Sequence, residues 1–300
     1  MKVNVIGWEG AWGQSRQVKE GLLLLGHALV DEGPCDFIYC MDKPSLPKAI
    51  EEARKWQSKL IVSILDLPIK EGTECEQSPS VTYEYRDQVL NNADRVYAIS
   101  EFTKQQIKRY WDFDDVTVVP VPSQFKLASP SPMAQRQNRV VCIGRLADPL
   151  KRAPLVLQAL ELMDEPPECM FIDCQGRAKF KSDKVQVTNC GFVPKYELRG
   201  ILRTSRAILC PSVFEGLGLP PIDALTVGTP AIISDIPVKR EVFGETSVLF
   251  HEPDNAESLA ACVQQLLNEP GLTTRIVKSA RAVVKEYQPD AVALKILENL

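Results

Sequence analysis

The sequence has little histidine, and its cysteines lack the pairing that metal sites need. Only two histidines occur in 300 residues, and the nine cysteines include no Cys-x-x-Cys pair. Structural zinc sites need four nitrogen or sulfur ligands at close spacing. The scattered cysteines, set among apolar strand-like segments, therefore favour reduced, buried thiols in a cytoplasmic protein over a metal site or a disulfide framework. We expect no bound metal.

We expect neither a membrane-spanning segment nor an export signal in this chain. Its longest apolar run, GLLLLGHALV, is shorter than the roughly 18–20 residues that span a bilayer. No basic segment followed by a small-residue cleavage site opens the chain. Peripheral membrane contact stays open for the basic and aromatic segment 102–111, although a buried apolar stripe with solvated basic residues explains this segment more simply.

The net charge of −4 is unevenly distributed. Residues 1–125 hold 14 Lys and Arg against 19 Asp and Glu, a net −5, and the remainder holds 21 against 20, a net +1. Proteins that bind nucleic acid usually have a basic face and a raised pI, whereas the pI here is about 5.5. This balance argues against a nucleic-acid partner without excluding a local basic patch.

The pattern of the chain predicts an α/β fold. In both halves, strand-like segments alternate with helix-like segments, which is typical of a parallel sheet with helices on both faces. The polar segment 126–138 interrupts the alternation and is expected to be a linker. We therefore expect two Rossmann-like domains facing across a cleft, at 1–125 and 139–284, with 285–300 packing back onto the first.

The segment 214–230, FEGLGLPPIDALTVGTP, is the most informative part of the sequence. A helix is expected to begin at Pro220 or Pro221, because proline is tolerated in the first helical turn. The backbone N–H groups around such a helix start form an anion site, and they belong here to Gly216, Leu217, Gly218 and Leu219. Glu215 and Asp223 flank this site and cannot bind phosphate, because like charges repel. They suit sugar hydroxyls on either side of a phosphate, which predicts a nucleotide sugar as ligand.

A second group of residues supplies positive charge. Arg145 directly follows a buried strand, and Lys151 comes six residues later, near the start of a helix. A guanidinium and an ammonium at one strand end suit a diphosphate. Taken alone, Arg145 and Lys151 could equally be solvated side chains of an ordinary loop. Together with 214–230, in this order, it predicts a diphosphate site.

Residues 140–268 resemble the nucleotide-binding domain of family four glycosyltransferases, the retaining enzymes with the GT-B fold. The matching blocks are GRLADPLK, the run from GFVPKYELRG to PAIISD, and the tail from VLFHEPDN to VQQLL. The resemblance implies that Arg145 and Lys151 hold the donor diphosphate and that Glu215 contacts the transferred sugar. Asp223 stands where the family's second carboxylate binds the ribose. This carboxylate is usually Glu, so the shorter Asp predicts a longer or water-bridged contact.

The N-terminal half matches the family more loosely. Residues 7–13, GWEGAWG, resemble its glycine-rich first loop, and Gly10 is the expected point of close approach to the donor. A glycine-rich turn without a ligand is the alternative. Many members carry a histidine where this chain has Leu65 and Asp66; Asp66 either contacts the sugar or the acceptor, or caps the next turn. Ser100 is expected to be a helix N-cap, with its side chain a candidate to face the cleft.

These features predict a metal-independent retaining glycosyltransferase that uses a UDP or GDP sugar and no further cofactor. Retention in the family is explained by front-face attack, in which the leaving phosphate accepts the proton of the acceptor. The acceptor stays open among a glycan, a lipid, a small molecule and nucleic acid. Two alternatives remain: an enzyme that glycosylates nucleic-acid bases, and a non-catalytic subunit that binds a nucleotide sugar. Salt-dependent binding to duplex DNA would favour the first, and donor hydrolysis without acceptor would count against the second.

Overall fold

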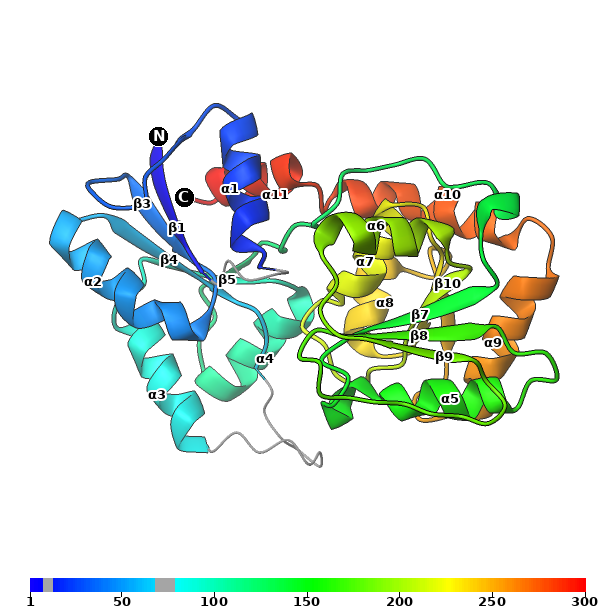
Figure 1. The fold of residues 1–300 in the computed structure, drawn as a ribbon. Helices are drawn as coiled ribbons and strands as arrows, with labels where there is room; N and C mark the ends of the chain where they lie inside the picture. The colour runs from blue at the N-terminus through cyan, green and yellow to red at the C-terminus, as the bar shows by residue number, and fades with distance from the viewer. Residues whose placement is uncertain (8–12, 68–78) are drawn as a thin grey trace. The chain divides into compact units, whose positions relative to one another are not determined.

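The computed structural model describes residues 1–7, 13–67 and 79–300. The chain forms two compact units, Met1–Gln124 with Glu286–Leu300, and Phe125–Lys285. Each unit contains a six-stranded sheet with helices on both faces (Figure 1), and every strand pair in both sheets is parallel. The predicted α/β class with two Rossmann-like domains is confirmed.

The sheet of the first unit has the strand order β2-β1-β3-β4-β5-β6. Its strands are β1 (Lys2–Ile6), β2 (Ala28–Leu29), β3 (Phe37–Cys40), β4 (Lys59–Ile64), β5 (Arg95–Ala98) and β6 (Val116–Val118). One face carries α1 (Ser15–Leu24) and α11 (Pro289–Glu298), and the other carries α2 (Leu46–Trp56), α3 (Pro79–Leu90) and α4 (Glu101–Trp111) (Figure 1).

The core of this unit explains why its central strands are apolar along their whole length. All four residues of β3 are buried, as are all residues of β4 after Lys59, because helices cover both faces of the sheet. On the face of α2, α3 and α4, one hydrophobic cluster includes Leu60 of β4 with Ile107 and Trp111 of α4. This packing accounts for the apolar positions of 102–111 without a membrane.

The C-terminal segment belongs to the first unit through α11. This helix packs against α1, and the contact is closest at Gly21, where an added Cβ would lie 2.0 Å from the carbonyl oxygen of Pro289. The hydroxyl of Tyr97 in β5 donates to the carbonyl oxygen of Asn299 at 2.7 Å. Residues 286–300 thus complete the face of the sheet that α1 covers.

The sheet of the second unit has the order β12-β11-β10-β7-β8-β9. Its strands are β7 (Arg139–Gly144), β8 (Glu168–Asp173), β9 (Val187–Cys190), β10 (Ala207–Cys210), β11 (Ala231–Ser234) and β12 (Leu249–His251). Helices α5 (Ala153–Glu161) and α9 (Ala256–Asn268) lie on one face; α6 (Lys195–Thr204), α7 (Leu219–Thr226) and α10 (Leu272–Lys285) lie on the other (Figure 1). Helix α8 (Pro237–Phe243) packs against α10.

The segment 126–138, expected as a linker, is held on the second unit. The buried guanidinium of Arg136 donates to the carbonyl oxygens of Ser205 at 2.7 Å and Gly228 at 2.6 Å. Gly228 has a φ of +84°, and a Cβ there would lie 2.4 Å from Cα of Pro130. These contacts form because the polar segment carries one arginine whose donors match carbonyl oxygens at the ends of α6 and α7.

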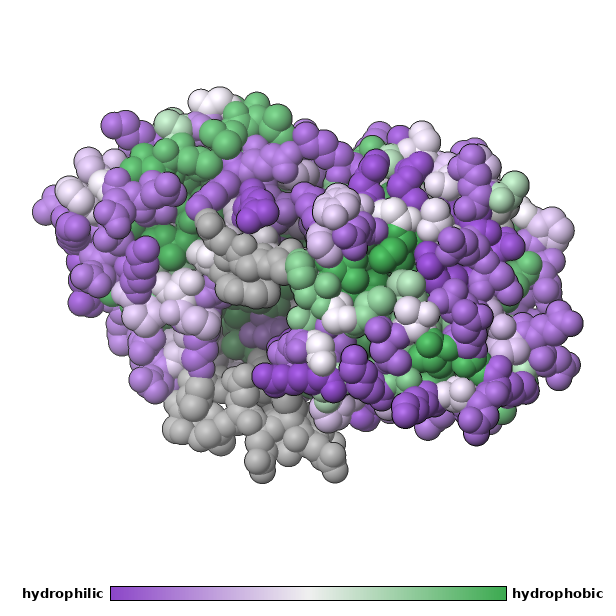
Figure 2. Space-filling view, in the orientation of Figure 1, coloured by the Kyte–Doolittle hydropathy of each residue, from purple (hydrophilic) through white to green (hydrophobic). Residues whose placement is uncertain are grey.

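The surface carries a hydrophobic area over the end of α1, visible in Figure 2. It includes the exposed side chains of Leu23 and Leu24. Among the helices that the structure describes, none is both long enough and apolar enough to span a bilayer.

Candidate functional site

The predicted donor residues of the second unit gather at the carboxyl ends of β7 and β10. From β7 the chain proceeds to β8 and β9 on one side, whereas β10, β11 and β12 lie on the other. The strand order therefore reverses between β7 and β10, which are hydrogen-bonded neighbours. Open α/β sheets bind their ligands at the carboxyl ends of the strands flanking such a switch point. Arg145 follows β7 and Glu215 follows β10.

The loop after β7 carries the two predicted cationic residues. Arg145 pairs with Asp148 at 3.5 Å, and 55% of its side chain is exposed. Asp148 also accepts the N–H of Leu150 at 3.0 Å, so it caps the short 3-10 helix Pro149–Lys151. This cap places Lys151 at the end of the loop, and a bond of 3.0 Å from the N–H of Val213 to the carbonyl oxygen of Leu150 ties the loop to the segment after β10.

Lys151 and Glu215 form an ion pair that joins the two predicted motifs. The Nζ atom of Lys151 donates to Oε1 of Glu215 at 2.8 Å, and the side chains are only 19% and 15% exposed. Burial alone would raise the pKa of Glu215, but Lys151 and Lys239 hold it below its ordinary value. Burial likewise would lower the pKa of Lys151, and Glu215 more than offsets this effect and raises it. Both groups are therefore charged at neutral pH.

The glycine-rich turn leads into α7 as the sequence predicts. The helix begins at Leu219, with Pro220 and Pro221 in its first turn, and Gly218 precedes it in the left-handed conformation with a φ of +94°. Within the described residues no side chain caps this helix start. Because Pro220 and Pro221 carry no N–H group, Leu219 supplies the N–H of the first turn that can face an anion. Asp223 lies within α7 and is buried.

A small cavity lies between these elements. It measures about 30 Å³, room for about one or two waters, and among its lining residues are Lys151, Glu215, Gly218 and Lys239. A nucleotide sugar is far larger than this cavity.

Asp173, which sequence reasoning did not single out, fixes the geometry of two loops at this edge. Its buried carboxylate accepts the N–H of Leu146 at 3.1 Å, next to Arg145. It also accepts three N–H groups of the loop after β8, those of Gln175, Arg177 and Ala178. Burial by itself would raise the pKa of Asp173, and these four backbone bonds lower it.

Lys239 is a second residue that the sequence pattern does not reveal. It belongs to α8, is fully buried, and lies beside the same cavity as Lys151 and Glu215. A lysine in the polar segment PVKRE is typical of a solvated helix face. The one feature of the sequence that could indicate a role for Lys239 is its position. It follows the apolar strand β11, and the candidate site lies at the carboxyl ends of strands of the same sheet.

The remaining predicted residues belong to the first unit. Gly10 lies outside the residues that the structure describes. Asp66 is exposed in the segment after β4. The hydroxyl of Ser100 accepts the N–H of Thr103 at 3.0 Å, so the predicted N-cap of α4 is confirmed. Ser100 itself is buried.

Each unit contains one of the two histidines. His27 lies next to the N-terminal amine in the first unit, 3.3 Å from it. His251 is buried at the end of β12, where burial lowers its pKa to about 4 and its Nδ1 lies 2.8 Å from the carbonyl oxygen of Glu252. Among residues 1–7, 13–67 and 79–300, no group of three or more His, Cys, Asp and Glu is arranged to hold a metal ion.

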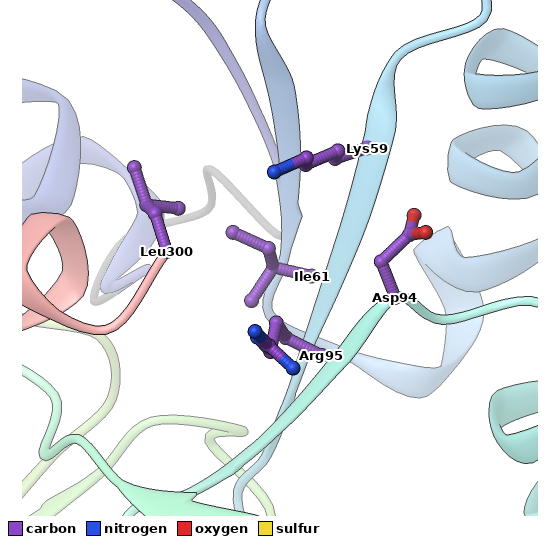
Figure 3. Close-up of a pocket in the computed structure, with 5 residues that line it drawn as sticks. All are labelled: Lys59, Ile61, Asp94, Arg95 and Leu300. Carbon is purple, nitrogen blue, oxygen red and sulfur yellow. The ribbon is translucent and has the colours of Figure 1, made fainter.

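A further cavity of about 240 Å³ occurs in the first unit, lined by Lys59, Ile61, Asp94, Arg95 and Leu300 (Figure 3). Lys59 begins β4 and Arg95 begins β5. The cavity therefore lies at the amino ends of these strands, the edge opposite to the one at which such sheets bind ligands.

The range of the second unit matches the model of a known protein family. A family model for glycosyl transferases group 1 matches residues 124–283. The chain belongs to this family of glycosyltransferases. The matched range contains Arg145, Lys151, Glu215 and Asp223, which all lie in this glycosyltransferase domain.

Individual relatives extend the likeness to both units. The chain is 23% identical to O-antigen chain mannosyltransferase B of Escherichia coli, over 84% of this chain and 70% of that protein. It is 35% identical to the O-antigen chain mannosyltransferase RfbU of Salmonella typhimurium, over 31% of this chain and only 26% of that protein.

A solved structure shares the whole fold. The Anabaena protein HepE, in complex with UDP and glucose, superposes with a TM-score of 0.77 at 14% identity, over 99% of this chain and 98% of HepE. This likeness covers both units. The GT-B architecture that the sequence predicts for this glycosyltransferase is confirmed.

Proposed function

We propose that this glycosyltransferase moves a sugar from a nucleoside diphosphate sugar to an acceptor, with retention of anomeric configuration and without a metal ion. The observation that carries the proposal is the Lys151–Glu215 ion pair of 2.8 Å at the switch point of the second sheet. It brings a cation for the diphosphate and a carboxylate for the sugar into contact, beside the uncapped start of α7.

Each side chain has a distinct task in this proposal. The exposed guanidinium of Arg145 binds the leaving diphosphate together with Lys151, and the positive end of the α7 dipole, with the N–H of Leu219, adds partial positive charge. Charge that develops on the leaving phosphate is thereby stabilised, which is commonly the largest contribution to such catalysis. Glu215, ionised at neutral pH, accepts hydrogen bonds from sugar hydroxyls. The leaving phosphate itself takes the proton of the acceptor in a front-face attack.

The relatives favour particular substrates. HepE was solved with UDP and glucose, which favours a UDP sugar over a GDP sugar as the donor. The names of the two mannosyltransferases refer to O-antigen chains, which favours a glycan acceptor over a nucleic-acid base or a non-catalytic role. A cytoplasmic location remains a prediction from the sequence.

The donor can be identified by a thermal-shift screen of UDP and GDP sugars. Ligand binding stabilises the native state by RT ln(1 + [L]/Kd), about 2.7 kcal/mol at 100 times Kd. We expect one nucleotide series to raise the melting temperature and the other to leave it unchanged. NMR of the product then reports the anomeric configuration, and activity in EDTA tests metal independence. An inverted product, or activity that is lost in EDTA and restored by a divalent cation, contradicts the respective part of the proposal.

The site assignment is tested by Arg145→Ala. We expect kcat/KM for the donor to fall roughly 100- to 1,000-fold, because a group that stabilises the leaving diphosphate is removed. The matched control is Arg275→Ala, since Arg275 is 58% exposed and also pairs with one carboxylate, that of Glu269 on the same unit. Equal activity of the two variants would refute the role of Arg145.

A further inference from the structure

The ammonium of Lys239 is buried inside the second unit among hydrogen-bond acceptors. None of its side chain is exposed. Its Nζ atom donates to the carbonyl oxygen of Cys210 at 2.7 Å, to the carbonyl oxygen of Ser212 at 3.1 Å and to Oγ of Ser234 at 2.7 Å. An ammonium has three N–H donors, so each of them has an acceptor.

These bonds hold the segment that leads to Glu215. Cys210 is the last residue of β10, and Ser212 lies between it and Glu215. The hydroxyl of Ser234, at the end of β11, also donates to the carbonyl oxygen of Ser212. Lys239 of α8 and Ser234 of β11 therefore both bind the carbonyl oxygen of Ser212, three residues before Glu215.

The charges around Lys239 connect it to the donor site. The ionisable groups that face it are those of Glu215, Lys151, Cys210, Cys142 and His251. Burial lowers the pKa of Lys239 to about 8, although Glu215 opposes this shift. Glu215 thus interacts with two cations that line the same cavity, and of these only Lys151 is partly exposed.

We propose that Lys239 is a positioning residue for Glu215: it holds the strand-end carbonyls that orient the Glu215 loop and keeps a positive charge beside the carboxylate when Lys151 engages the donor diphosphate. The inference rests on the proposed function, because it assigns Lys151 to the diphosphate. In the free protein Lys151 pairs with Glu215. Once a diphosphate attracts Lys151, the buried Lys239 is the cation that still faces Glu215 and cannot be withdrawn by the ligand. It touches no substrate itself.

The first test is the pH dependence of the wild-type protein and of Lys239→Arg. The pH profile of kcat/KM for the donor reports groups of the free enzyme. We expect the wild-type value to fall above about pH 8, where Lys239 loses its proton. In Lys239→Arg this decline should vanish, because a guanidinium stays protonated throughout this range. A wild-type profile that is flat from about pH 7 to 10, or a decline that is unchanged in an active Lys239→Arg, overturns the proposal.

The second test separates positioning from a merely structural role. In Lys239→Met we expect kcat to fall roughly 10- to 100-fold, the range typical for loss of a charged hydrogen bond, with affinity for UDP or GDP within about threefold of wild type because Arg145 and Lys151 are intact. The same change in a Glu215→Gln background should lower kcat little further, because Lys239 acts through Glu215. Equal factors in both backgrounds would refute the proposal. Lys278→Met, an exposed lysine on α10, is the control.

The outcomes distinguish this inference from the proposed function. If the wild-type protein binds no nucleoside diphosphate and turns over no donor, the proposed function fails. If it transfers sugar but the effects of Lys239→Met and Glu215→Gln on kcat are additive and the pH decline is absent, only the role of Lys239 fails. Should Lys239→Met not fold, the wild-type and Lys239→Arg profiles still decide.

Discussion

Asp173 stands out among single residues because one carboxylate satisfies four backbone N–H groups. Its Oδ2 atom accepts the N–H groups of Arg177 and Ala178, each at 2.7 Å, and its Oδ1 atom accepts that of Leu146. Carboxylates that accept several backbone bonds stay ionised even when buried. This residue joins the loop that carries Arg145 to the loop after β8, so it fixes the shape of both loops.

We expect Asp173→Ala to reduce the free energy of unfolding of the second unit by about 2–4 kcal/mol, because buried N–H groups are left without an acceptor. Urea denaturation followed by circular dichroism measures the loss. Replacing the exposed Asp183 in the same way should change stability by no more than about 0.5 kcal/mol. A loss for Asp173→Ala within the range of this control would contradict the assignment.

The same contribution should depend on pH. The folded pKa of Asp173 lies below its ordinary value of 3.8, so the carboxylate stabilises the native state at pH values above 3.8 and loses this effect as the pH falls through the folded pKa. The difference between wild type and Asp173→Ala should therefore be constant near neutrality and shrink below pH 3.8.

At the scale of elements, the contact between α1 and α11 depends on a glycine. Gly21 lies within α1, where glycine is unfavourable by about 0.5–1 kcal/mol relative to alanine. The close approach of Pro289 gives the reason for this residue: a Cβ would overlap its carbonyl group and approach Cβ of Ala293 to 2.9 Å. In the sequence, Gly21 is only a residue that lowers helix stability. In the structure, it is the position at which α11 packs closest to α1.

We expect Gly21→Ala to destabilise the first unit by more than about 1 kcal/mol, since overpacking outweighs the gain in helix propensity. The control is Gly200→Ala in α6, where no atom lies within 4 Å of the added Cβ, and this change should stabilise the protein slightly. Thermal unfolding of both variants shows whether each change raises or lowers the stability of the protein. Stabilisation by Gly21→Ala would show that α11 does not pack on α1 as described.

At the scale of the whole molecule, the chain leaves the first unit after Gln124, builds the second unit, and returns at Glu286. The first unit is thus completed only by residues 286–300, which follow the second unit in the sequence. Its late segment contributes α11 and the carbonyl oxygens that accept the hydroxyl of Tyr97.

Removal of residues 286–300 should therefore affect the two units differently. We expect α1 and β5 to lose protection against hydrogen exchange, because their packing partner and the acceptors of Tyr97 are gone. The second unit should keep its affinity for the nucleoside diphosphate found in the donor screen. Unchanged protection of α1, measured by mass spectrometry, would contradict this dependence.

Much of the architecture follows from local patterns. The buried strand before Arg145, which is β7, and the proline-marked start of α7 are where the sequence predicts them, since strand burial and helix starts depend on neighbouring residues. The alternation does not predict α8, α10 or α11. The segment of α8 is only seven residues long. Helix α11 lies in the segment 285–300 that is expected to pack back onto the first domain, and its packing partner α1 comes from the opposite end of the chain.

The sequence by itself determined the α/β class, the family and the candidate residues Arg145, Lys151, Glu215 and Asp223, because motif spacing and the alternation of strands and helices can be read along the chain. Only the tertiary structure decided that Lys151 and Glu215 contact each other and that Lys239 is buried behind them. An ammonium can be buried only where acceptors converge on it. The acceptors of Lys239 come from the segment after β10 and from β11, which meet when the sheet forms.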